Sequence, residues 1–137
     1  MNPNTLLFPV MALSGWTLLV LLLVPFHRFR AGFNGRVKIE DFRFGESARV
    51  PGDVSIPNRN FMNLLEVPVL FYVLCLMAYI SHSSLSPALA WTYVGLRLLH
   101  SLIHLSYNDV IHRLSIYATS NFVLAALWIQ LLLALSR

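Results

Sequence analysis

The chain has 137 residues, of which 57% are hydrophobic and only 12% are charged. Soluble domains are roughly 45–50% apolar and about 25% charged, so this composition excludes an ordinary soluble protein and indicates a single-domain membrane protein. The net charge of +4 does not indicate a nucleic-acid partner, because seven of the ten Lys and Arg residues lie between Arg28 and Arg59. Membrane topology explains such a cluster better.

Four hydrophobic runs predict an all-α integral membrane four-helix bundle in one domain, residues 1–137. The first run carries no charge and is long enough to span a bilayer, which takes about 20 residues. It has neither a basic segment before it nor a small-residue cleavage site, so we interpret it as a retained helix and not as a signal peptide. The predicted helices cover about residues 5–26, 58–82, 87–108 and 111–135, with a polar loop at 27–57.

The 27–57 loop is rich in Gly, Pro and charge. Val37, Ile39 and the pair Phe42 and Phe44 predict either a short extended piece or a loop lying on the membrane surface. The loop and the start of the second run hold the seven basic residues, while the turn at 82–87 has none. The positive-inside rule therefore places the first and third connections in the cytoplasm and both termini outside.

The second run contains three polar side chains on one helical face. Arg59, Asn63 and Glu66 are spaced i, i+4 and i+7. The strongly apolar residues of this run favour insertion by about 5 kcal/mol in sum, while one acidic side chain costs at most about 3.5. Pairing would relieve that cost, and we expect a structural ion pair between Glu66 and Arg97 that fixes the register of the second and third helices.

The third and fourth runs carry further polar groups at helical spacing. His100 and His104 are spaced like the two histidines of a zinc helix, but the metalloprotease glutamate is missing between them. Hydrogen bonds to neighbouring helices or to a ligand explain them more simply than a metal or haem. Arg113 either snorkels to lipid phosphate or forms an anion site with Arg59. The single Cys75 excludes an internal disulfide and a multi-cysteine metal site.

These spacings resemble those of the MAPEG family, the membrane-associated proteins in eicosanoid and glutathione metabolism, and especially its bacterial-type members. Arg59-x3-Asn63-x2-Glu66, followed by Pro68, is similar to the helix-2 signature of the family. The helix-3 and helix-4 pattern is matched by Arg97, His100, His104, Arg113 and Tyr117. Another branch of the family has tyrosines where this chain has the two histidines, so no eicosanoid substrate is assigned.

The resemblance implies a homotrimer in the bacterial inner membrane, with glutathione bound between subunits on the cytoplasmic side. It implies a glutathione-dependent transferase or peroxidase that acts on a lipophilic electrophile. Arg113 would be the catalytic residue, facing the thiol and favouring the thiolate. The residues implied to bind the cofactor are Arg59, Asn63, Glu66, His100, His104 and Tyr117.

Two other functions remain compatible with the residues. The first is a non-catalytic membrane binding or scaffold protein of the same fold. The second is a small channel or proton relay that uses the ionisable residues of the second and third helices. We rank it last because the polar stripes gather toward one side of the bilayer instead of crossing it.

Overall fold

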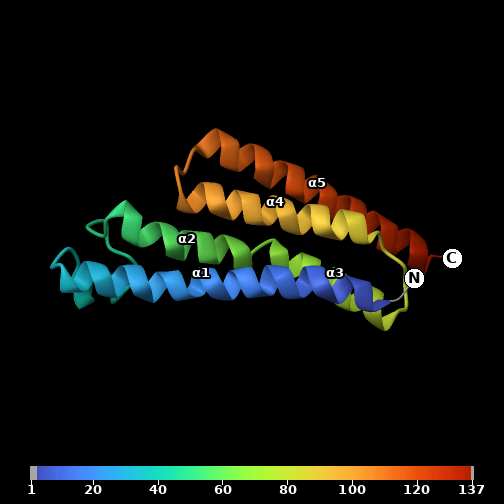
Figure 1. Ribbon diagram of the computed structural model, residues 1–137, viewed down its shortest axis with the longest axis horizontal. Helices are drawn as coiled ribbons and strands as arrows, with labels where there is room; N and C mark the ends of the chain where they lie inside the picture. The colour runs from blue at the N-terminus through green and yellow to red at the C-terminus, as the bar shows by residue number, and fades with distance from the viewer. Residues whose placement is uncertain (1–2, 137) are drawn as a thin grey trace.

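The computed structural model describes residues 3–136, and every named element in that range is a helix (Figure 1). The predicted all-α fold class is therefore confirmed. Short 3-10 turns are found at Pro3–Leu6 and Ile39–Phe42. The α-helices are α1 (Leu7–Phe33), α2 (Gly52–Leu65), α3 (Pro68–Ile80), α4 (Pro87–Leu105) and α5 (Val110–Leu135).

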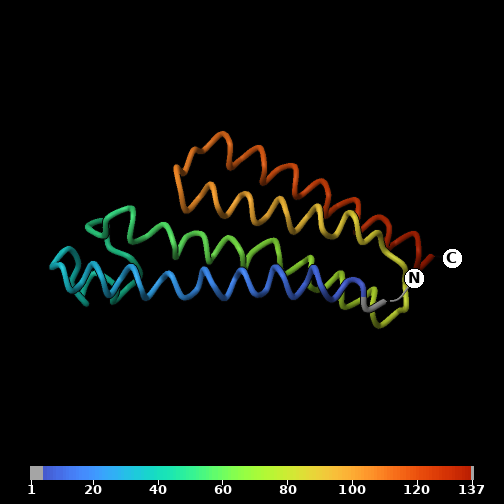
Figure 2. The backbone as a smooth tube through the Cα atoms, in the orientation of Figure 1, coloured from blue at the N-terminus to red at the C-terminus, as the bar shows by residue number. Residues whose placement is uncertain are grey.

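The chain makes four lengthwise passes, because α2 and α3 follow one another along the bundle (Figure 2). The two ends of the chain lie at one end of the bundle. The loop 34–51 and the turn between α4 and α5 lie toward the other end (Figure 1). Both connections therefore face the same side of a membrane, which agrees with the topology expected from the basic residues.

Three stretches of the described chain are long and apolar enough to cross a membrane: Leu7–Phe33, Gly52–Ile80 and Val110–Leu135. The remaining pass, α4, is more polar because Arg97, His100 and His104 lie on it, and all three are buried inside the bundle. Many leucines of α1 and α5 are exposed on the outside. This pattern is that of a multi-pass integral membrane protein, in which apolar side chains face lipid.

A buried hydroxyl joins three of the helices. Ser101 of α4 accepts a hydrogen bond from the indole N–H of Trp16 in α1 at 2.8 Å. Its oxygen also accepts one from the amide of Asn60 in α2 at 2.7 Å. Each interhelical hydrogen bond in a membrane contributes about 0.6–2 kcal/mol. The network fixes α2 against α4, and that arrangement positions the polar side chains described below.

The first helix is longer than predicted. It was expected to end at residue 26, where the apolar run stops, but α1 continues to Phe33. Arginine is a good helix former, so the basic residues after the apolar run extend the helix. Asn34 caps the helix and Gly35 follows it. The N–H of Gly35 bonds the carbonyl of Gly32 at 3.0 Å, and Gly35 has φ +68°.

The second pass begins earlier than predicted and is broken in the middle. α2 starts at Gly52 and not at 58, with Asp53 in its first turn, where an acidic side chain favours a helix N-terminus. The expected continuous helix 58–82 is interrupted at Glu66 and Val67. Pro68 explains the break, because proline has no N–H and its ring clashes with the carbonyl four residues earlier.

Asp41 organises the loop 34–51. Its carboxylate accepts hydrogen bonds from the backbone N–H of Lys38 and the hydroxyl of Ser47, both at 2.9 Å. The guanidinium of Arg49 lies 3.1 Å from the same carboxylate. These contacts, the Lys38 N–H first among them, hold the pKa of Asp41 below its ordinary value of 3.8.

A lowered pKa makes the loop sensitive to acid. The stabilisation by Asp41 is complete above the ordinary pKa of 3.8 and is lost as the pH falls through the lower, folded-state value. We therefore expect hydrogen exchange in the loop, corrected for the intrinsic rate, to rise below about pH 4. Asp41→Asn should already exchange faster at neutral pH and respond less to acid. An identical acid response in both proteins would contradict this role.

Candidate functional site

An open cleft of about 320 Å³ lies between α2 and the α4–α5 turn. It contains five of the residues that the sequence singled out: Arg59, Asn63, Glu66, His104 and Arg113. Three helical segments supply them, so the tertiary structure brings together groups far apart in the chain. The remaining lining residues are Ile56, Asn58, Met62 and Asn108.

A second hollow of about 230 Å³ adjoins the first. Asn63 and Arg113 line both hollows, and His100 and Tyr117 line only the second. Val110 and Leu114 complete its lining with apolar surface. Arg113 therefore lies where a polar cleft meets a partly apolar hollow. This arrangement suits a site that binds both a charged ligand and a lipophilic ligand.

The guanidinium of Arg113 is held by its own turn. Its Nη1 donates a hydrogen bond to the side-chain oxygen of Asn108 at 2.7 Å. Asn108 has φ +52°, a left-handed conformation that asparagine tolerates better than most residues. Its backbone N–H bonds the carbonyl of Ile103 at 2.8 Å and so ties the turn to the end of α4. The turn geometry thus places a fixed hydrogen-bond acceptor beside the predicted catalytic arginine.

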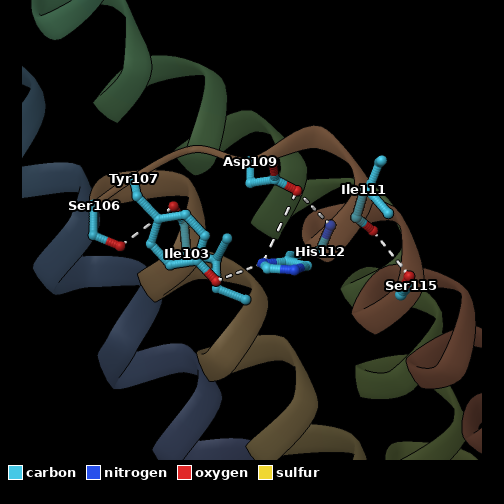
Figure 3. Close-up of polar contacts among 7 residues, drawn as sticks. All are labelled: Ile103, Ser106, Tyr107, Asp109, Ile111, His112 and Ser115. Carbon is cyan, nitrogen blue, oxygen red and sulfur yellow. Dashed lines mark hydrogen bonds and ion pairs between the residues drawn. The ribbon is translucent and has the colours of Figure 1, made fainter.

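The rest of the α4–α5 turn is braced by a small polar cluster (Figure 3). The carboxylate of Asp109 accepts the backbone N–H of His112 at 2.9 Å and caps the N-terminus of α5. This hydrogen bond is the main cause of a lowered pKa at Asp109. The hydroxyl of Tyr107 lies 3.1 Å from Nδ1 of His112. These contacts fix the start of α5, on which Arg113 stands.

No salt bridge joins Glu66 and Arg97 in the structure, and the two charges interact only at longer range. Arg97 is only 1% exposed, and its Nη2 donates to the backbone carbonyl of Asn63 at 2.8 Å. Glu66 is exposed at the break after α2. The last carbonyls of a helix lack partners within it and carry partial negative charge. Arg97 therefore caps the C-terminus of α2, and the break caused by Pro68 explains why it bonds a carbonyl and not the carboxylate.

The two histidines are buried beside this arginine. Their rings are stacked with centroids 6.2 Å apart. His100 also contacts the ring of Tyr117 edge to face at 5.7 Å, and Arg97 lies over that ring at 5.2 Å. Three buried nitrogens have no hydrogen-bond partner among residues 3–136. They are Nε2 of His100 and the Nε and Nη1 atoms of Arg97. Buried donors and acceptors are normally paired, so these unpaired atoms mark this cluster as a candidate polar site.

Several residues that line the clefts were not predicted from the sequence. Ile56 lies three residues before Arg59 and Met62 lies four residues before Glu66, so both continue the helical face that the sequence indicated. No role was predicted for Asn108 from the sequence. Its bond to Arg113 carries no periodic signal, because it depends on the left-handed backbone of one residue.

The fold and the clefts define a class: a multi-pass helical membrane protein with convergent polar side chains at one end of its bundle. The chain belongs to the MAPEG family, whose model matches residues 6–133. This match confirms the resemblance over nearly the whole sequence. Members of this family are in general membrane proteins that use glutathione in transferase or peroxidase reactions. Neither the curated proteins nor the solved structures compared with the chain give a significant match.

Proposed function

We propose that this protein is a glutathione-dependent membrane transferase or peroxidase acting on a lipophilic electrophile. The observation that carries the proposal is Arg113, held by Asn108 at the junction of two hollows. One hollow is polar and carries both charge signs, and the other has apolar surface from Val110 and Leu114 of α5. A hydrophilic thiol and a lipid-dissolved electrophile could meet at that junction.

The polar cleft fits a zwitterionic peptide such as glutathione. Glu66 is exposed and without an ion pair among the described residues, so it is free to bind an amino group. Arg59 and Asn63 offer donors to a carboxylate from the same wall. His100 lines the adjoining hollow, and its buried Nε2 has no hydrogen-bond partner among the described residues. The cleft volume falls at the lower end of the range of about 300–1,000 Å³ for small-molecule sites.

Glutathione would supply the thiol nucleophile, and Arg113 would favour its ionised form. A thiol has a pKa of about 8.5, and lowering it by two units needs about 2.7 kcal/mol. One cation about 4 Å away supplies about 4 kcal/mol at an effective dielectric constant of 20. A single arginine is therefore sufficient to make the thiolate the main species at neutral pH.

The same proposal includes a homotrimer in a bacterial inner membrane, with the site on the cytoplasmic side. Both clefts are open in the single chain, and Glu66 is exposed at the edge of one of them. A neighbouring subunit against this face would enclose the ligand. The basic loop and the α4–α5 turn lie on the same side, which the positive-inside rule assigns to the cytoplasm.

The first test is calorimetric titration of the protein in lipid nanodiscs with glutathione. We expect binding at millimolar concentration or tighter, and at least tenfold weaker binding for Glu66→Gln, because the glutathione amine loses its counter-charge. Arg30→Ala is the matched control, since Arg30 lines neither cleft. Absence of binding to a folded protein would overturn the proposal and favour a non-catalytic binding or scaffold protein of the same fold.

A further inference from the structure

A third hollow lies away from both clefts, where the end of α1 meets the loop 34–51. Its volume is about 680 Å³, more than that of either cleft. We call it the α1 trough, and it shares no residue with the clefts. Its lining is Val24, Pro25, Arg28, Phe29, Gly32, Phe33, Val37, Lys38, Ile39 and Phe42.

The α1 trough lies at the depth of the lipid headgroups. α1 has 27 residues and is therefore about 40 Å long, whereas the hydrocarbon core of a bilayer is about 30 Å thick. The part of α1 that exceeds this thickness is its basic end, which carries His27, Arg28 and Arg30. In Figure 1 the ends of α1 and α2 extend beyond the α4–α5 turn. The trough thus spans the boundary between acyl chains and headgroups.

The walls of the α1 trough are apolar and largely uncovered. Phe33 and Ile39 are each 89% exposed, and Phe29 is also exposed. Large apolar side chains in an exposed hollow mark a binding surface, because leaving them in water costs about 25 cal/mol per Å². An acyl chain is the partner that a membrane supplies at this depth.

The charges around the trough select an anionic lipid. Arg28 is neutralised by Glu46 at 2.9 Å and lies over the ring of Phe42 at 4.7 Å. Arg36 and Arg49 are likewise paired, with Asp53 and Asp41. Within the described chain, three cations at the end of α1 and in the loop have no ion pair: Arg30, Lys38 and Arg43. The one acid there without an ion pair is Glu40. Lys38 lines the trough itself.

We propose that the α1 trough binds an anionic phospholipid of the surrounding leaflet. One acyl chain lies against Phe29 and Phe33, and the lipid phosphate pairs with Lys38 at the rim. The apolar contact supplies the affinity, while the unpaired cation supplies the preference for anionic over zwitterionic headgroups. The site is independent of the proposed reaction, because none of its residues lines the catalytic clefts.

Glycine at position 32 gives a direct way to fill the trough. A Cβ added to Gly32 meets no atom within 4 Å, so Gly32→Leu projects into the hollow without clashing with the protein. Gly15 lies on the same helix, is also exposed, and also has nothing within 4 Å of an added Cβ. Gly15→Leu is therefore a matched control that changes α1 in the same way but leaves the trough open.

The test is the lipid retained by the full-length protein after purification from nanodiscs containing equal phosphatidylglycerol and phosphatidylcholine, measured by mass spectrometry. We expect the unmodified protein and Gly15→Leu to retain phosphatidylglycerol preferentially, and Gly32→Leu to retain at least fivefold less. Lys38→Gln should keep the bound lipid but lose the preference. Circular dichroism checks that every variant is folded.

Two results would overturn the proposal. Equal retention by Gly32→Leu and Gly15→Leu would mean that the lipid binds elsewhere on the outside of the bundle. Equal retention of both lipids by the unmodified protein would mean that the retained lipid is an adventitious additive only, bound around the bundle without selection by the trough. Glutathione binding by Gly32→Leu should remain unchanged, so failure here and failure of the proposed reaction are distinguishable.

Discussion

Arg113→Ala should lower the turnover of thiol conjugation at least tenfold. The physical reason is the loss of the cation that lowers the thiol pKa, since a tenfold change in rate corresponds to about 1.4 kcal/mol of lost stabilisation. The measurement is steady-state kinetics with glutathione and a chloronitrobenzene electrophile in nanodiscs. We expect the defect to shrink toward pH 9, because the free thiol then ionises unaided near its ordinary pKa of about 8.5.

The conservative variant separates charge from geometry. Arg113→Lys keeps a cation but loses the planar fork that Asn108 holds, so its activity should lie between those of the parent protein and Arg113→Ala. The oligomeric state of each variant is checked by size exclusion. Unchanged turnover in Arg113→Ala would remove this residue from the catalytic role. A defect that is constant from pH 6 to 9 would also contradict thiolate stabilisation.

Asn108→Gly should lower kcat about three- to tenfold and change KM for glutathione little. Glycine accepts the φ of +52° without strain, so this variant removes the acceptor of Arg113 while the turn keeps its shape. A hydrogen bond to a charged group contributes about 1.5–3 kcal/mol, and part of this is lost because Arg113 is partly exposed. The measurement is the kcat and KM pair, together with the ultraviolet absorbance of bound thiolate.

A control for this variant lies on the same turn (Figure 3). Tyr107→Phe removes the hydroxyl that contacts His112 at 3.1 Å but leaves the Asn108–Arg113 bond intact. We expect it to retain the parent kcat and the parent thiolate signal. If Tyr107→Phe and Asn108→Gly lowered kcat equally, the turn would matter only for stability, and Asn108 would not be a positioning residue.

Much of the fold follows from local patterns. Four hydrophobic runs separated by polar segments predict the passes, because a bilayer admits only helices with every backbone group bonded internally. Helical periodicity places Arg59, Asn63 and Glu66 on one face, and the structure finds them in one cleft. Boundaries were less well predicted, since hydrophobicity ends at the membrane while the α1 helix continues to Phe33.

The partners of buried charges could not be predicted in the same way. An arginine and a glutamate at similar depth suggested an ion pair, yet Arg97 bonds the carbonyl of Asn63. That choice depends on the break at Pro68, which exposes helix-end carbonyls and leaves Glu66 at the surface. Helical periodicity predicts which face of a helix a side chain occupies. It does not predict which backbone acceptors become free where the neighbouring helix is interrupted.

The sequence by itself determined the class of this protein, its four passes and the polar residues that converge at one end. These properties depend on composition and spacing, and both are local. Only the tertiary structure decided that Arg97 caps α2, that Asn108 holds Arg113, and that α1 and its loop enclose a separate trough. The first of these joins segments 34 residues apart, the second needs the left-handed backbone of Asn108, and the third exists only where the end of α1 packs against the loop that follows it.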